Sequence, residues 1–329
     1  MFIDKLIEKI IEKNNPTIAG LDPRIEFIPE SIKKKHFNKH GDSLKACANA
    51  IWEFNVKILD AISDIVPAVK LQLGYFEMYG LDGIKVFRDT IELIKKKGLL
   101  VIVDGKRNDI LTTAQAYSSA YLGRVTTGGN VERPVFDVDA LTVNPYLGVD
   151  GVKPFINDCK KYGKGIFILV KTSNKSSGQL QDLITHEGKS IYEVVAEHVD
   201  KWTRGLVGKY GYSSVGAVVG ATYPNQAKVL RKILKRSYIL VPGYGAQGGT
   251  AKDVVYSFGA DGLGAVVNAS RSIMCAYKSD IWKDVYSEDK FDEACKAEAI
   301  RMRDDIIDAI CKNNKTIGGN ILNESCSDT

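Results

Sequence analysis

Eight short apolar runs, separated by segments of helical periodicity, constrain the fold of this chain more than any other feature. The runs cover residues 17–21, 68–74, 99–105, 140–146, 165–171, 214–220, 238–244 and 263–269. Nearly continuous apolar runs of this length are typical of parallel strands that are covered on both faces. Eight alternating strands and helices predict a single-domain α/β fold, the (β/α)8 TIM barrel. The alternative is an open doubly wound sheet, but "AGLDPR" after the first run lacks the glycine pattern of a dinucleotide turn.

The barrel is expected to occupy residues 1–312, including an extra helix at the N-terminus. Residues 313–329 show little periodicity, so we expect this C-terminal tail to fray. Two long polar connections, 122–136 and 173–190, follow the third and fifth predicted strands. Long loops on this side of a barrel often carry function or close over a substrate, although 122–136 is equally well explained as a tolerated insertion.

Composition and charge exclude several classes of partner. The net charge of +5 comes from dispersed lysines and arginines, with no aromatic-interleaved basic motif. We therefore expect no nucleic-acid partner. No apolar run approaches 18 residues, so we expect no membrane span. The N-terminal "MFIDKLIEKIIEK" has the charge spacing of an amphipathic helix rather than a signal peptide, which predicts a cytoplasmic protein.

Charged residues gather where the second and third strands end, which is where barrel enzymes place their active sites. Side chains alternate along a strand, so Asp104 and Lys106 share one face, and Lys70 on the neighbouring strand could meet Asp104. With Asp109 just beyond, two ammonium groups and two carboxylates would alternate. Buried charges are tolerated when they are paired in this way. The pattern predicts either a reaction site or a purely structural salt-bridge network at the rim of the barrel.

A second group of residues suits an anion. The run "GYGAQGG" at 243–249 has four glycines, which allow backbone N–H groups to converge on an anion. Arg271 follows the eighth strand and offers a planar fork for phosphate. Barrel phosphate sites commonly form after strands 7 and 8. The alternative is a tight glycine turn beside an unrelated surface arginine.

Metal and cofactor motifs are lacking in the sequence. The cysteines lie at least 15 residues apart, and His36 and His40, although spaced i, i+4, sit among lysines without a third ligand nearby. We therefore expect neither a metal nor an organic cofactor. With four histidines, none convincingly at a strand end, the chemistry is expected to depend on lysine and aspartate.

Six segments together resemble one family. "DGKRNDI" (104–110) resembles the D-x-K-x-x-D-I signature of orotidine 5′-phosphate decarboxylase. "GLDPR" (20–24), "VKLQLGYFE" (69–77), "KTSNKSSG" (171–178), "VPGYGAQGG" (241–249) and "NASRSI" (268–273) are similar to that family as well, and occur in the family's order. The length and the two long connections resemble its longer bacterial form.

The resemblance implies a cofactor-free decarboxylation of orotidine 5′-phosphate to UMP, the last step of de novo UMP synthesis. Lys106 would stabilise and protonate a carbanion at C6, Asp104 would lie against the substrate carboxylate, and Lys70 would orient Asp104. Substrate-binding roles are implied for Asp22 at the ribose, Ser173 at the pyrimidine edge, and Gln247, Gly248, Gly249 and Arg271 at the phosphate. The family forms homodimers, so Asp109, Ile110 and Thr113 would complete the partner subunit's site.

One departure from the family concerns the phosphate. Shorter members often place a tyrosine three residues after the phosphate arginine, and Met274 occupies that position here. Either another group substitutes for the tyrosine or the phosphate has one contact fewer.

Three alternative functions are compatible with parts of the pattern. A metal-dependent 3-keto-sugar phosphate decarboxylase or synthase shares the Asp-x-Lys-x-x-Asp signature but needs Mg²⁺ and further acidic ligands. A nucleotide-binding protein without catalysis would use the same pocket. A Schiff-base aldolase would use a lysine as a nucleophile.

Overall fold

Eight parallel strands close into a barrel in the computed structural model, which describes residues 1–318. The spatial order is β1-β10-β9-β8-β7-β6-β3-β2, and every neighbouring pair is parallel. The barrel strands are β1 (Thr17–Leu21), β2 (Ala68–Gln72), β3 (Leu100–Arg107), β6 (Ala140–Val143), β7 (Gly165–Lys171), β8 (Ser213–Val219), β9 (Ser237–Pro242) and β10 (Ala265–Ala269). The predicted TIM barrel is confirmed, and the open sheet is excluded because β1 pairs with both β2 and β10.

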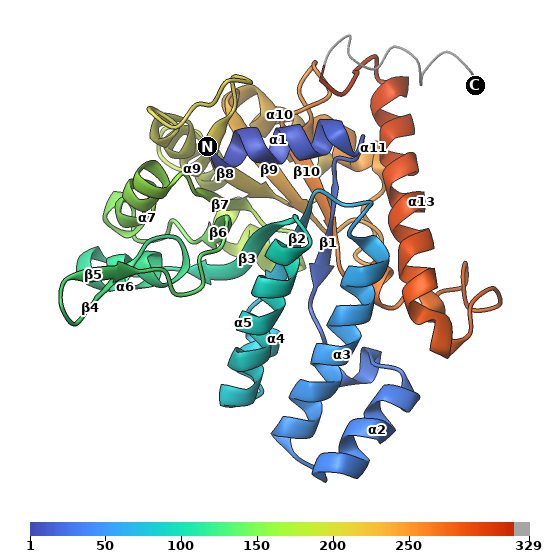
Figure 1. Ribbon diagram of the computed structural model, residues 1–329. Coiled ribbons are helices and arrows are strands. Elements are labelled where there is room, and N and C mark those ends of the chain that lie inside the picture. Colours follow the sequence, from blue (N-terminus) through green and yellow to red (C-terminus); the bar gives the residue numbers. More distant parts are fainter. Residues whose placement is uncertain (319–329) are drawn as a thin grey trace.

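Helices follow every barrel strand and cover the outside of the barrel (Figure 1). The longer ones are α2 (Glu30–His40), α3 (Leu44–Ile62), α5 (Gly80–Lys96), α6 (Leu111–Tyr121), α7 (Val149–Tyr162), α9 (Ile191–Trp202), α10 (Pro224–Ile233) and α13 (Phe291–Lys312). Four short helices are α4 (Gly74–Glu77), α8 (Gly178–Gln181), α11 (Ala251–Val254) and α12 (Arg271–Met274).

Local sequence explains where several helices begin. The Ser43 hydroxyl accepts a hydrogen bond from the Ala46 amide at the start of α3. Ser190 and Glu193 form a capping box on α9, and Thr250 forms one with Asp253 on α11. Each cap satisfies amide groups that have no partner within the helix. Pro224 occupies the first turn of α10, where its missing N–H costs nothing.

The extra N-terminal helix is confirmed as α1 (Phe2–Glu12), and it covers the amino-terminal end of the barrel (Figure 1). Phe2 is buried edge-on against Phe167, with 6.0 Å between the ring centroids. Its ring also fills the space beside Gly165, where an added Cβ would lie 2.2 Å from it. The Ile3 amide donates to the Ser214 hydroxyl at the start of β8. The barrel is therefore closed at this end by side chains of α1.

Strand and loop boundaries differ from the prediction in several places. The second run stops at Gln72 because the chain turns into α4, and the fourth stops at Val143. The connection 122–136 contains a small antiparallel hairpin of β4 (Val125–Thr127) and β5 (Val131–Arg133), both on the surface. Such short polar strands carry no apolar alternation to reveal them.

The first residues of the predicted C-terminal tail contact the rest of the fold. The Lys315 ammonium donates to the carbonyls of Val255 and Phe258, and Ile317 is buried. The fraying of residues 313–329 stays a prediction, and residues 319–329 lie outside the described part of the chain.

Candidate active site

A cavity of about 550 Å³ opens at the carboxyl ends of the barrel strands. Among the residues that line it are seven with predicted site roles: Asp22, Lys70, Asp104, Lys106, Ser173, Gln247 and Arg271. They come from loops or ends of β1, β2, β3, β7, β9 and β10. The barrel thus brings together residues that lie up to about 250 positions apart in the sequence, as expected for this architecture.

Three of the four residues of the predicted charge cluster, Lys70, Asp104 and Lys106, meet at the ends of β2 and β3, with Asp22 as the second carboxylate. The Lys70 ammonium lies 3.2 Å from the Asp22 carboxylate and 3.4 Å from that of Asp104. The Lys106 ammonium lies 2.7 Å from the other oxygen of Asp104. Lys70 is buried, whereas 46% of the Lys106 side chain is exposed to the cavity side. Lys106 is therefore the ammonium that a ligand in the cavity could reach.

Two further side chains fix Asp104, and the sequence interpretation assigned a role to neither. The Gln72 amide donates to one Asp104 oxygen over 2.8 Å, and the Thr142 hydroxyl donates to the other over 2.8 Å. Thr142 also accepts from the Lys106 amide over 2.9 Å. The position of Thr142 at the end of a strand was the only available signal. With all these partners, the Asp104 carboxylate has one well-defined orientation.

Proton affinities in the cluster follow from burial and charge together. Burial alone would raise the pKa of Asp104, but the ammonium groups of Lys70 and Lys106 outweigh it and lower the pKa to about 2. Burial would likewise lower the pKa of Lys70, but Asp22 and Asp104 raise it above its ordinary value. Both groups are therefore charged at neutral pH.

The backbone of β3 departs from a regular strand where it reaches the site. Its pairing with β6 shifts register between Val103 and Arg107, and Lys106 has a φ of +45°. Left-handed backbone at a non-glycine residue is uncommon and marks local strain at functional sites. The Arg107 side chain is absent from the cavity lining, and its guanidinium donates to the Glu77 carboxylate over 2.8 Å and to the Tyr121 hydroxyl over 3.3 Å.

Asp109, Ile110 and Thr113 do not line the cavity of their own chain. The Asp109 carboxylate accepts from the Ile110 amide, and Ile110 and Thr113 are exposed. Within one subunit, the structure therefore joins Lys70, Asp104 and Lys106 but leaves Asp109 outside.

The opposite end of the cavity carries the predicted anion-binding side chains. Gln247 and Arg271 both line the cavity, and the Arg271 guanidinium donates to the Ala246 carbonyl over 2.7 Å. The amides of Gly248 and Gly249 donate to Gly245 and Gly243 within the turn. Glycine is required at 243 and 248, where φ is +99° and +93°. The amides of Gly248 and Gly249 thus stabilise the turn, whereas the side chains of Gln247 and Arg271 line the cavity.

Other cavity residues had no predicted role: Arg24, Tyr75, Asn268 and the buried Met274. Arg24 adds a fourth cationic side chain to the wall, beside Lys70, Lys106 and Arg271. It lies in the quoted "GLDPR" segment, so a cation next to Asp22 was the available signal.

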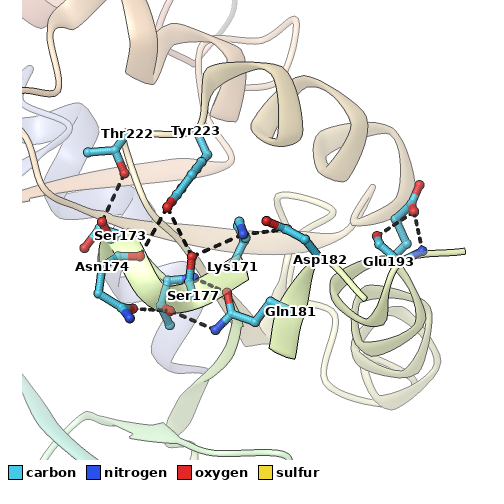
Figure 2. Close-up of polar contacts among 11 residues, drawn as sticks. Lys171, Ser173, Asn174, Ser177, Gln181, Asp182, Glu193, Thr222 and Tyr223 are labelled. Atoms are coloured by element: carbon cyan, nitrogen blue, oxygen red, sulfur yellow. Dashed lines mark hydrogen bonds and ion pairs between the residues drawn. The ribbon is translucent and has the colours of Figure 1, made fainter. Parts of the chain in front are cut away.

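The segment after β7 forms one wall of the cavity, with Thr172, Ser173 and Asn174 among the lining residues. Figure 2 shows Ser173 and Asn174 on this segment. The predicted loop 173–190 is ordered by a short 3₁₀ turn at Lys175–Ser177, by α8, and by an isolated bridge between Ile184 and Ser190. Ser173 thus lines the cavity, and its predicted contact with the pyrimidine edge stays a prediction.

Within residues 1–318, no group of three or more histidine, cysteine or acidic side chains is arranged to hold a metal ion. Over the same residues, none of the helices combines the length and the apolar character that crossing a bilayer requires.

Comparison with known proteins assigns the family. Residues 18–280 match the model of the orotidine 5′-phosphate decarboxylase / HUMPS family. The orotidine 5′-phosphate decarboxylase of Caldicellulosiruptor bescii is 47% identical over 86% of this chain and 92% of its own length. The chain belongs to the orotidine 5′-phosphate decarboxylase family.

Two further relatives extend the match. The orotidine 5′-phosphate decarboxylase of Rhodopirellula baltica is 43% identical over 93% of this chain and 98% of its own length. The structure of Leishmania donovani OMP decarboxylase has a TM-score of 0.68 and 26% identity, and the match covers 94% of this chain and 98% of that one. The predicted family, its longer bacterial form and its class of enzyme, a carboxy-lyase, are confirmed.

Proposed function

We propose that this orotidine 5′-phosphate decarboxylase family member converts orotidine 5′-phosphate to UMP without a cofactor, as the last step of de novo UMP synthesis. The observation that carries the proposal is the Lys70–Asp104–Lys106 cluster, fixed by hydrogen bonds at one end of a cavity whose other end holds Arg271. A nucleotide carboxylate would lie at the first end and its phosphate at the second.

The chemistry requires stabilisation of charge rather than an electron sink. When the bond between C6 and the carboxylate breaks, CO₂ leaves and the electron pair stays on C6 in the plane of the ring. The Lys106 ammonium, held 2.7 Å from Asp104, would stabilise this pair and then transfer a proton to it. Because the ammonium is already in place, little reorganisation accompanies the developing charge.

Asp104 would act on the ground state. Its low pKa keeps it anionic beside the substrate carboxylate, which raises the energy of the bound substrate relative to the transition state. Lys70 and Asp22 would hold Asp104 and the ribose hydroxyls, respectively. Gln247 and Arg271 would bind the phosphate, and binding energy from that remote group would hold the substrate against the cluster.

We further propose that the active unit is a homodimer in which Asp109, Ile110 and Thr113 complete the partner subunit's site. Two observations support this: Asp109 lies outside its own cavity, and exposed apolar side chains lie in the segments that follow β3 and β6. These side chains are Ile110, Leu111, Tyr146, Leu147 and Val149. An exposed apolar cluster of this kind is typical of a subunit interface.

Hybrid dimers test the shared site. Asp109→Ala and Lys106→Ala subunits are each expected to be inactive, because each lesion damages both sites of its homodimer. In a hybrid, one site is intact, so an equal mixture should regain about one quarter of wild-type activity after random exchange. Absence of recovery after subunit exchange has been verified by mass spectrometry would rule out the shared site.

The decisive assay for the activity follows the loss of orotidine 5′-phosphate absorbance in excess chelator, with Lys106→Ala in parallel. The proposal requires full turnover by the wild type and its loss in Lys106→Ala. Loss of turnover in chelator would instead favour a metal-dependent sugar-phosphate reaction of the HUMPS type.

Two other functions give different results. UMP binding without release of CO₂ from orotidine 5′-phosphate would indicate a nucleotide-binding protein. Trapping of a lysine adduct by borohydride would indicate a Schiff-base aldolase, although the raised pKa of Lys70 keeps that amine protonated and therefore a poor nucleophile. For the location, we propose the cytoplasm.

A further inference from the structure

Lys171, the last residue of β7, is a buried cation that the proposed chemistry does not use. None of its side chain is exposed, and it does not line the cavity. Burying an ammonium group costs several kcal/mol unless its partners compensate. A residue with this cost at the end of a barrel strand therefore requires an explanation.

None of the side chains that Lys171 contacts lines the cavity, and Figure 2 shows three of them around its ammonium group. Its ammonium lies 2.6 Å from the Asp182 carboxylate and 3.2 Å from the Ser177 hydroxyl, both on the segment that follows β7. It also lies 4.4 Å from the centroid of the Tyr223 ring, a distance typical of a cation–π contact. Lys171 thereby connects Ser177 and Asp182, on the segment after β7, with Tyr223, on the connection after β8.

A register shift in β7 accounts for this direction. The pairing of β7 with β8 is irregular between Leu169 and Lys171. Leu169 and Thr172 line the cavity, whereas Val170 and Lys171 between them do not. Regular alternation would place Lys171 on the same face as Leu169, so the irregularity turns the Lys171 side chain away from the cavity. Thr172 in the cavity wall and Lys171 in the ion pair with Asp182 are therefore neighbours in the chain.

The Gln181 side chain, on α8, also holds residues of the cavity wall. The Gln181 amide accepts from the Thr172 N–H over 3.0 Å and donates to the Thr172 hydroxyl over 2.8 Å. This double hydrogen bond returns α8 to the end of β7, and it depends on the same short segment, 177–182, that Lys171 holds.

The connection after β8 fixes the next two carbonyls. The Thr222 hydroxyl donates to the Ser173 carbonyl, and the Tyr223 hydroxyl donates to that of Asn174 (Figure 2). The Tyr223 hydroxyl also accepts from Ser177. The Tyr223 side chain thus meets Lys171 with its ring and the cavity wall with its hydroxyl.

We propose that Lys171 is a positioning residue, whose ion pair with Asp182 holds residues 172–174 in the conformation that receives the pyrimidine ring. This inference rests on the proposed function for the identity of the ligand. It assigns the base end of the nucleotide, and not the phosphate end, to the wall that Lys171 supports. Without the ion pair, binding must first order the segment, and that cost appears as weaker binding of ligands that carry the base.

The test compares two ligands in Lys171→Met and Asp182→Asn. UMP has the base, and ribose 5-phosphate has only the phosphate and the sugar. We expect the dissociation constant for UMP, measured by calorimetry, to rise at least tenfold in both variants, and that for ribose 5-phosphate to change less than threefold. In steady-state assays, KM for orotidine 5′-phosphate should rise more than kcat falls.

Matched variants separate the ion pair from general effects on the loop. Asp182→Glu keeps the negative charge, and the longer side chain has room to adjust because that of Asp182 is 43% exposed. The dissociation constant of this variant for UMP should stay within about threefold of wild type, which is less than the ~1.4 kcal/mol of a tenfold change. Lys189 lies on the same loop and forms a partly exposed ion pair with Glu197 of α9. Lys189→Met removes this ion pair and should leave the dissociation constants for both ligands unchanged.

Each outcome decides the proposal. Unchanged UMP binding in Lys171→Met, or equal weakening of both ligands, overturns it. If Lys171→Met does not fold, the contrast between Asp182→Asn and Asp182→Glu decides in its place. If the wild type binds UMP but does not turn over orotidine 5′-phosphate, the proposed function fails, and the comparison of ligands still tests Lys171.

Discussion

Replacing Asp104 with asparagine should change how the stability of this protein depends on pH, by an amount set by the charge cluster. The carboxylate has a pKa of about 2 in the folded protein, against 3.8 for an unperturbed aspartate. A group with a depressed pKa contributes stability above its unfolded pKa and loses it as the pH falls toward the folded value. At 1.36 kcal/mol per pH unit, Asp104 contributes roughly 2.4 kcal/mol of this pH-dependent stability at pH 7.

Part of that contribution should be lost within an accessible pH range. Applying the same linkage to the two pKa values, the free energy of unfolding of the wild type should fall by about 1.1 kcal/mol more than that of Asp104→Asn between pH 7 and pH 3. Carboxylates elsewhere titrate in both proteins and cancel in the difference.

Urea unfolding, followed by circular dichroism at each pH, measures both curves. Asp284→Asn serves as a control because it removes a carboxylate on the protein surface, and its curve should run parallel to that of the wild type. If the curve of Asp104→Asn also runs parallel, Lys70 and Lys106 do not hold the carboxylate ionised, and the electrostatic basis of the site is wrong.

Two further predictions concern the ends of the barrel. Arg271→Ala should lower kcat/KM for orotidine 5′-phosphate at least 100-fold, or ~2.7 kcal/mol, because the phosphate anchor is lost, and a change within about threefold would refute the phosphate assignment. Phe2→Ala should lower the free energy of unfolding by about 3–5 kcal/mol, because a buried ring is lost from between α1 and β7, whereas the truncation of the exposed Met1 should have little effect. Chemical denaturation of both variants measures this difference.

The sequence was most informative where strand geometry determines which side chains meet. The pairing of Lys70 with Asp104 could be predicted because β2 and β3 are adjacent in the chain and their side chains alternate. Thr142 could not be predicted, because a threonine within an apolar strand is common and its partner lies 38 residues away. Gln72 was left without a role for a similar reason.

The spacing of apolar and polar residues does not predict local irregularities of the backbone. Regular alternation does not reveal that Lys171 turns away from the cavity, because the shift in β7 depends on its pairing with β8. The glycine turn at 243–249 was recognised, but its composition does not show that the amides of Gly248 and Gly249 are used within the turn. Closing such turns depends on contacts that form only in the folded chain.

The helix that covers the amino-terminal end of the barrel affects the route by which substrate and products would enter and leave the cavity. Over residues 1–318, Phe2 fills the space beside Gly165 at the amino-terminal end of the barrel, and the cavity opens at the carboxyl ends of the strands. In the proposed reaction, substrate, CO₂ and UMP would therefore pass through that opening. The segment after β7 lines the cavity, so it would border the path that both products take.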